Sequence, residues 1–194
     1  DATLTGTTLS PAVTLTGDKV AKHEGLIELQ TNAKKSAAII GKRETGSTKK
    51  LTIENVGTAT NSATLDIKST ESVGINATNT AGTATDLVVK NEYGKINVEG
   101  EKSVGINALE STVTNDTNGI IELKNEKTAG IIATKSSKVT NKGNITLTGP
   151  TVGITASGNG LVGVSLAGSE LTNEGSITMN TAYSTGVYAN DYVN

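Results

Sequence analysis

A six-residue phrase that returns along the chain constrains its fold more than any other feature. Ser-Val-Gly-Ile-Asn-Ala occupies residues 72–77 and is repeated unchanged at 103–108, with looser copies at 128–133, 151–156 and 184–189. Repetition with a period of roughly 20–26 residues is typical of stacked supersecondary units, because each unit buries its apolar side chains only against its neighbours. The chain is therefore expected to be a repeat protein.

A second phrase, an apolar residue followed by Thr-Asn, lies upstream of several copies of the first, at 113–115, 139–141 and 171–173. It leads through a glycine into an alternating run such as Ile121-Glu122-Leu123 or Ile145-Thr146-Leu147. Alternation with a period of two places apolar side chains on one face of a β-strand. No segment has the i, i+3, i+4, i+7 spacing of an amphipathic helix. Each unit is predicted to contain three short strands separated by turns.

Three strands per unit predict a triangular coil, and stacking coils about 4.8 Å apart pairs each strand in parallel with its copy one coil later. The sequence thus predicts an all-β fold, a parallel β-helix (β-solenoid) of about seven coils of roughly 20–26 residues. We expect a right-handed coil, because coil length varies and the strict hexapeptide repeat of left-handed forms is missing. The composition agrees, since Phe and Trp are absent and a narrow interior is filled by Ile, Val, Leu and Ala. Disorder is the alternative for so polar a chain, but it does not explain the registered alternation.

We expect residues 1–194 to form one β-helix segment of a longer array, because open ends would expose unpaired strand edges. Residues 1–18 are predicted to form an irregular first coil, and residues 19–189 the regular repeats. Breaks in the period predict protruding insertions, because insertions in repeat arrays lie in surface loops. These insertions are expected near 42–50, 78–86 and 149–168.

The register of the last insertion is ambiguous, because Val152-Gly153-Ile154 and Val162-Gly163-Val164 both resemble the third strand. Gly163 stands ten residues before Asn173, as Gly105 stands ten before Asn115. We therefore assign the third strand to the segment that contains Gly163.

Asparagine recurs at one corner of the predicted coils. Stacking would bring the amides into a hydrogen-bonded ladder, and asparagine tolerates the left-handed conformation expected at a corner. A polar stripe that contacts a ligand is the other interpretation, and the internal ladder is favoured. The corner residues are Asn55, Asn91, Asn115, Asn141 and Asn173.

The charges are nearly balanced, with 17 basic and 19 acidic residues and a net charge of −2. Such a chain has no overall positive field for nucleic acid. The most basic loop is the insertion near 42–50, which would suit an anionic glycan or surface, and loops of repeat arrays often carry binding. A solvated turn without a partner is the alternative for each loop. Candidate contacts are Lys42, Arg43, Lys49 and Lys50 in this loop and Ser157 and Asn159 in the insertion near 149–168.

Residues suited to catalysis are scarce, with one arginine, one histidine and no cysteine. Glycan-cleaving β-helices need clustered carboxylates, often with Ca²⁺, and here the carboxylates are scattered among turns. We therefore predict no enzyme activity, no cofactor and no metal site, with a glycan-cleaving enzyme kept as an alternative. An ice-binding β-solenoid is a second alternative, suggested by Thr-x-Thr pairs at 3–5, 14–16 and 146–148, although the outward residues also include Glu, Lys and Asn.

Together, the x-Ser-x-Gly-[Ile/Val]-x-Ala and Thr-Asn-x-Gly-x-Ile-x-[Leu/Val] phrases resemble the passenger domains of very large type V autotransporter adhesins of Gram-negative bacteria. The resemblance covers about residues 19–189. It implies a secreted right-handed β-helix at the cell surface, tethered to the outer membrane only through a C-terminal β-barrel that is not part of this chain. The implied function is attachment to a host-cell or bacterial surface protein or glycan, as a rigid stalk or an adhesive segment. No binding residue is carried over, because the matching positions are core and corner residues.

Overall fold

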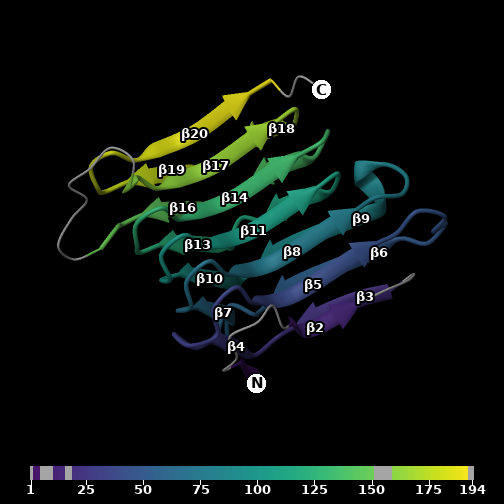
Figure 1. Cartoon of the computed structure of the whole chain (residues 1–194), viewed down its shortest axis with the longest axis horizontal. Helices are drawn as coiled ribbons and strands as arrows, with labels where there is room; N and C mark the ends of the chain where they lie inside the picture. The colour runs from purple at the N-terminus through teal and green to yellow at the C-terminus, as the bar shows by residue number, and fades with distance from the viewer. Residues whose placement is uncertain (1, 5–10, 16–18, 151–158, 192–194) are drawn as a thin grey trace.

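The computed structural model describes residues 2–4, 11–15, 19–150 and 159–191, which form a right-handed parallel β-helix (Figure 1). The strands that face the viewer in Figure 1 run from left to right while the chain climbs from the N-terminus at the bottom to the C-terminus at the top. No helix among the described residues is long and apolar enough to span a membrane.

Successive coils contribute their strands to three parallel sheets, two of seven described strands and one of six. Sheet A contains β1 (Ala2–Leu4), β4 (Leu26–Leu29), β7 (Ala63–Ile67), β10 (Gly94–Val98), β13 (Ile120–Leu123), β16 (Asn144–Leu147) and β19 (Ser176–Met179). Sheet B contains β2 (Pro11–Leu15), β5 (Ala37–Arg43), β8 (Val73–Asn79), β11 (Val104–Leu109), β14 (Ala129–Thr134), β17 (Val162–Ala167) and β20 (Thr185–Asn190). Sheet C contains β3 (Lys19–His23), β6 (Leu51–Val56), β9 (Leu87–Glu92), β12 (Thr112–Asn115), β15 (Lys138–Asn141) and β18 (Glu170–Asn173).

The apolar side chains of the predicted alternating runs fill the interior. In sheet A, Ile96 pairs in register with Ile121 and Ile121 with Ile145, and all three side chains are fully buried. In sheet B, Ile106 and Ile131 form an equivalent buried column. Burying one such side chain contributes about 1.5–3 kcal/mol, so the fold is stabilised layer by layer along the axis.

Coil length is more variable than the sequence predicts. Equivalent corner asparagines are separated by 24 residues between Asn91 and Asn115 and by 26 between Asn115 and Asn141. The separation rises to 36 between Asn55 and Asn91 and to 32 between Asn141 and Asn173. The predicted coil length of roughly 20–26 residues holds for these two middle coils and for the first and last steps, 25 residues from Ala2 to Ile27 and 23 from Val164 to Val187. It is wrong elsewhere, because the other coils carry insertions at their turns.

Two segments inserted between strands lie at turns. Residues 44–50 connect β5 to β6, and residues 80–86, which end in the 3₁₀-helix η1 (Ala84–Asp86), connect β8 to β9 (Figure 1). Residues 151–158 of the third insertion lie outside the described residues. The register assignment there is confirmed, because Val164 in β17 pairs with Ile131, which puts Gly163 at the position of Gly130.

The reason given for asparagine at the corners is wrong. The positive-φ residues among those described lie in turns between strands, for example Lys35, Glu71 and Lys102, and the corner asparagines are not among them. Each corner asparagine instead occupies the last or next-to-last position of a strand in sheet C. Asparagine is used there for its amide rather than for its backbone.

The coil nearest the C-terminus leaves its inward side chains uncovered. Met179 pairs with the buried Leu147 and Val187 with the buried Val164. The exposed fractions are 51% for Met179 and 43% for Val187, although both continue columns of the core. This uncovered coil provides a natural comparison for substitutions made in the interior.

Candidate functional site

The basic loop is organised around a buried arginine. The Arg43 side chain is 6% exposed, and its Nε and Nη2 donate hydrogen bonds to the carbonyl oxygens of Lys49 (2.6 Å) and Ser47 (2.7 Å). Nη1 donates to Asn79 Oδ1 at 3.3 Å and lies 3.7 Å from Asp86 Oδ2. The pKa of the Asp86 carboxyl is lowered, chiefly by the backbone N–H of Thr83 and further by the charge of Arg43. Arg43 thus joins the loop at 44–50 to the next insertion.

The prediction that Arg43 contacts a partner is therefore corrected. A guanidinium with this many internal partners must stay inside, because burying a charge is tolerated only when it is paired and hydrogen-bonded. The remaining predicted basic contacts, Lys42, Lys49 and Lys50, are exposed. Lys42 forms an ion pair with Glu44 at 2.7 Å, which lowers the pKa of Glu44.

The two predicted contact loops are not brought together. Residues 44–50 follow β5, whereas Asn159 precedes β17, so the two loops lie at opposite ends of the strands of sheet B (Figure 1). Asn159 is half-buried, and its carbonyl oxygen accepts a hydrogen bond from the Lys127 N–H at 3.0 Å. Ser157 lies outside the described residues.

The corner ladder expected from the sequence is present. The Nδ2 group of each asparagine donates to Oδ1 of the next, at 2.7 Å from Asn55 to Asn91, 2.7 Å from Asn91 to Asn115, 2.8 Å from Asn115 to Asn141 and 2.8 Å from Asn141 to Asn173. The first four members are fully buried, and Asn173 at the uncovered coil is exposed. The amide groups hydrogen-bond to one another inside the protein, so this corner is a structural element rather than a stripe that contacts a ligand.

His23 occupies the first position of the ladder. Its Nδ1 lies 2.8 Å from Asn55 Oδ1, and since the Asn55 amide already donates from Nδ2, Nδ1 must carry the proton. Nε2 is buried and has no hydrogen-bond partner among the described residues. Burial lowers the pKa of His23 below its ordinary value, although the hydrogen bond to Asn55 acts in the opposite direction. The ring is therefore held neutral.

Serine forms two further ladders that the sequence analysis missed. The backbone N–H of Ser36 donates to Ser72 Oγ (3.1 Å), and that of Ser72 donates to Ser103 Oγ (3.0 Å). At another turn, the N–H of Ser111 donates to Ser137 Oγ at 3.0 Å. The signal was available, because serine immediately precedes the repeated Val-Gly-Ile phrase in two exact copies.

The outer face of sheet A is polar and charged. Lys68 pairs with Glu28 at 2.9 Å, and Lys124 pairs with Glu99 at 3.1 Å. The hydrogen bond to Glu28 raises the pKa of Lys68. Between these pairs, the buried Asn97 donates from Nδ2 to Asp66 Oδ1, and its own Oδ1 has no partner among the described residues. Among the described residues, no group of three or more His, Cys, Asp or Glu is arranged to hold a metal ion.

The outer face of sheet C mixes threonine with charge. Thr114, Thr140 and Thr172 stand in one column, and the same column contains the ion pair between Lys90 and Glu54 at 3.0 Å. Threonine on sheet A is equally limited, since the column of Thr146 also contains Glu122 and Asp66. Neither face offers the uniform Thr-x-Thr array that ice binding would require.

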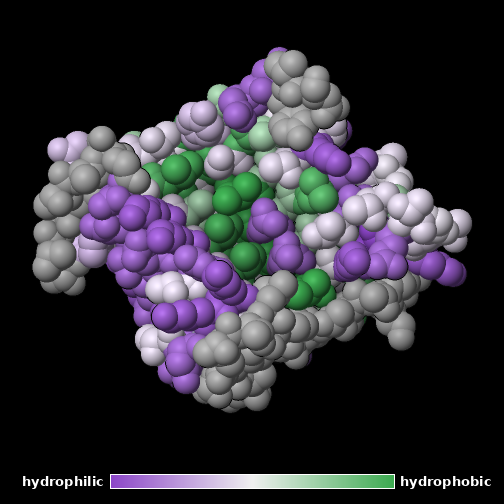
Figure 2. All heavy atoms as spheres, in the orientation of Figure 1, coloured by the Kyte–Doolittle hydropathy of each residue, from purple (hydrophilic) through white to green (hydrophobic). Residues whose placement is uncertain are grey.

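The outer face of sheet B differs from both. On β5, β8, β11, β14, β17 and β20 its outward positions carry a single charge, Lys42 at the edge, and otherwise Ala, Val, Ile, Leu, Asn, Thr, Ser and Tyr, with Ala37 and Ala129 buried. Hydrophobic residues gather at the centre of this face, and hydrophilic ones flank it (Figure 2). The flanking turn carries ion pairs between coils, for example Lys35 with Glu71 and Lys127 with Glu101. We call these outward side chains the sheet B face.

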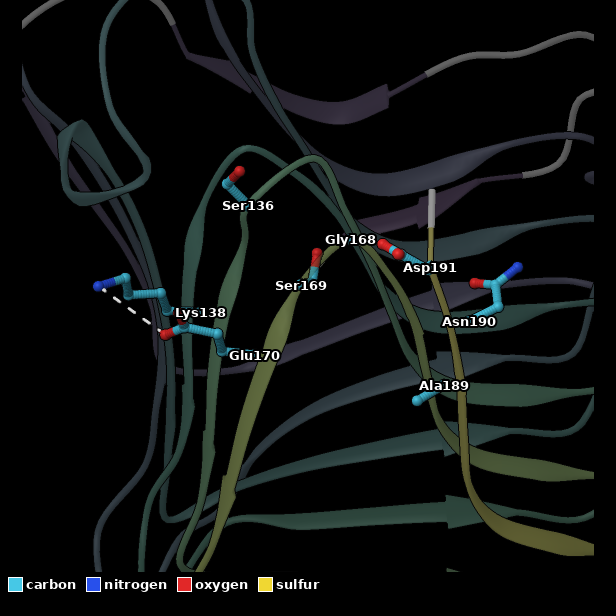
Figure 3. Close-up of a pocket in the computed structure, with 8 residues that line it drawn as sticks. All are labelled: Ser136, Lys138, Gly168, Ser169, Glu170, Ala189, Asn190 and Asp191. Carbon is cyan, nitrogen blue, oxygen red and sulfur yellow. Dashed lines mark ion pairs between the residues drawn. The ribbon is translucent and has the colours of Figure 1, made fainter. Parts of the chain in front are cut away.

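A pocket of about 520 Å³ lies where sheets B and C meet at the uncovered coil (Figure 3). Lys138 and Glu170 form an ion pair across one side of it, with Nζ and Oε2 3.9 Å apart. The pocket contains no nucleophile with an activating base. It is lined by Ser136, Lys138, Gly168, Ser169, Glu170, Ala189, Asn190 and Asp191.

These features define a β-helical repeat domain whose buried asparagines and serines form hydrogen-bonded ladders from coil to coil and whose surfaces are flat sheets and short turns. A family model described as the BigA third pectate lyase-like domain matches residues 3–192. The chain belongs to this family. Comparison with curated proteins and with solved structures gave no significant match.

Proposed function

We propose that the chain is a segment of a secreted bacterial surface adhesin that mediates or supports attachment to host cells or to other bacteria. The observation that carries this proposal is the family match over residues 3–192, because BigA is an autotransporter-like adhesin. By the same analogy, the protein would be exposed at the cell surface as an autotransporter passenger and tethered to the outer membrane.

The shape of the molecule supports this proposal. About seven coils spaced ~4.8 Å apart give a rod roughly 35 Å long, stiffened by sheets and by hydrogen-bonded ladders that run from coil to coil. A stiff stack of coils with three flat faces can act as a spacer, or as an adhesive segment on which many weak contacts add through multivalency. The partner would be a surface protein or glycan rather than nucleic acid, because the net charge is only −2.

Binding of the purified chain to host cells and to partner bacteria tests the proposal. One variant carries Lys49→Ala and Lys50→Ala in the exposed basic loop, a second lacks residues 149–160, and Lys95→Ala on sheet A is the matched control. Binding that is weakened by the loop changes and unaffected by the control would identify this segment as adhesive. A chain that binds no cell surface in any form would refute the adhesive role and leave the stalk role.

A glycan-cleaving enzyme is the second candidate, and one observation favours it. A second pocket of about 500 Å³ includes the Asp66 carboxylate on sheet A, the family is described as pectate lyase-like, and enzymes that cleave glycans use carboxylates. Incubation with acidic and neutral polysaccharides, with and without Ca²⁺, tests it. Release of oligosaccharides that Asp66→Asn abolishes would support an enzyme, and intact polysaccharides would rule it out. The pocket is lined by Gly25, Leu26, Asn61, Ser62, Thr64 and Asp66.

A further inference from the structure

Two of the three outward columns of the sheet B face read alike in both directions along the stack over β5, β8, β11 and β14, whereas the third column (Lys42, Thr78, Leu109, Thr134) does not. Its central column runs Ile40, Asn76, Asn107, Ile132 on β5, β8, β11 and β14. The column beside it runs Ala37, Val73, Val104, Ala129 on the same strands, and of these Ala37 (0% exposed) and Ala129 (8% exposed) are buried within the chain. Both columns are therefore symmetric about the line between β8 and β11.

Such a pattern matches what a two-fold interface requires. In an isologous contact the same patch meets itself, so residue i faces residue j while j faces i. When two copies meet face to face, a two-fold axis along the strands between β8 and β11 keeps each column opposite itself and inverts the order of coils. Asn76 then faces Asn107 of the second copy, and Ile40 faces Ile132 of the second copy. The two rods would lie antiparallel.

The polar groups at the centre of the face fit the same arrangement. Asn107 Nδ2 donates to Asn76 Oδ1 at 2.9 Å within one chain. This bond leaves the Asn76 Nδ2 group and the Asn107 Oδ1 atom available for further hydrogen bonds at the surface. Across the axis, each Nδ2 group of Asn76 meets an Oδ1 atom of Asn107 in the second copy, twice by symmetry. Buried polar groups need such partners.

Charge distinguishes this face from the others. Packing sheet A against another protein would desolvate ion pairs such as Lys68 with Glu28, and packing sheet C would desolvate Lys90 with Glu54. Desolvating ion pairs is costly. The sheet B face carries only Lys42, at its edge, and its centre combines Asn76 and Asn107 with Ile40 and Ile132. Burying this face therefore removes fewer charges from water than burying either of the other two.

We propose that the sheet B face joins two copies of this chain as an antiparallel, two-fold dimer. Six overlapping strands of about six residues give a contact of roughly 600 Å² per copy. A stable interface covers about 800 Å² per partner, so the dimer forms at micromolar rather than nanomolar concentrations. The proposal does not rest on the adhesin function, because it concerns the purified chain alone.

Sedimentation velocity of the full chain over about 1–200 μM tests dimer formation in the range expected for micromolar affinity. The wild-type chain is expected to change from monomer to dimer within this range. Ile132→Glu, which places a charge opposite Ile40 of the second copy, is expected to weaken the dimer at least about tenfold. Thr146→Glu, at a half-buried outward position on sheet A, is the matched control and should leave the dimer unchanged. Far-UV circular dichroism checks that each variant remains folded.

A mixing experiment tests the antiparallel arrangement. Ile40→Lys alone should also weaken the homodimer. An equimolar mixture of Ile40→Lys and Ile132→Glu should restore a dimer, because lysine in one copy then faces glutamate in the other while the second contact remains Ile against Ile. A wild-type chain that stays monomeric to 200 μM, which is about the upper limit of the series, would overturn the proposal, even if the face were found to bind a glycan. Folded single variants whose mixture fails to dimerise would overturn the two-fold register.

Discussion

Replacing Asn115 by alanine would break the corner ladder at a fully buried position. Three hydrogen bonds are lost, namely the one accepted from Asn91 (2.7 Å), the one donated to Asn141 (2.8 Å) and the one donated to the Gly119 carbonyl oxygen (3.3 Å). Each hydrogen bond contributes about 1 kcal/mol net, and a buried group left without a partner costs about 1–3 kcal/mol. Because a small cavity relieves little of this cost, we expect the variant to lose about 3–5 kcal/mol of unfolding free energy.

Asn173 provides the matched control within the same ladder. It accepts the same bond from Asn141 (2.8 Å) and donates to the Gly175 carbonyl oxygen (3.2 Å), but it is exposed at the uncovered coil. Water can replace the lost partners there, so Asn173→Ala should cost less than about 1 kcal/mol. Urea denaturation followed by circular dichroism measures both variants. Equal losses of unfolding free energy for Asn115→Ala and Asn173→Ala would refute the reasoning, because burial of the ladder would then add nothing to the cost of breaking it.

Three further predictions follow from other buried contacts. Burial holds the pKa of His23 below its ordinary value of 6.5, so the free energy of unfolding should be constant above about pH 6.5 and fall as the pH decreases toward the lower folded pKa. His23→Asn should abolish this pH dependence. Denaturation series across pH 4–8, which spans about the titration range of histidine, measure it. Gly130→Ala would place a methyl group 2.6 Å from the Gly163 carbonyl oxygen, whereas Gly186→Ala meets nothing closer than 3.6 Å; we expect a loss of about 1–3 kcal/mol for the first and little change for the second, measured by urea midpoints. Arg43→Met removes the hydrogen bonds that hold the loop at 44–50, so limited proteolysis should cleave there much faster than in the wild-type chain, and unchanged cleavage would show that the loop is held by other contacts.

The architecture could be predicted from the sequence because every coil repeats the same local rules. Alternating residues such as Ile121 and Leu123 specify a buried face, and the ten-residue spacing between Gly163 and Asn173 assigned the correct strand to an ambiguous coil. The asparagine ladder could be predicted for the same reason, since parallel stacking in register brings identical side chains together.

Features that depend on contacts between insertions could not be predicted. Arg43 lies in a basic stretch that looks solvated, and only its carbonyl partners in the loop at 44–50, together with Asn79, explain its burial. The repeated glycine also gave no indication of its role. In the structure it allows close approach, because a methyl group at Gly105 would lie 2.7 Å from the carbonyl oxygen of Gly130 in the next strand. The distinction between charged and uncharged faces required the register of all three sheets.

The ladder of corner asparagines has a consequence for how such a rod can change in length. Removing the residues that separate two equivalent corners, for example the 24-residue step from Asn91 to Asn115, would rejoin the ladder, the core columns and all three sheets, while outward neighbours would change, since Asp66 would then lie beside Glu122 in place of Asn97. A duplication of the same step would be accepted equally well. Insertions or deletions of any other size must be absorbed by a turn. The length of the stack along its axis therefore changes only in steps of ~4.8 Å, while its loops can vary in length without changing it.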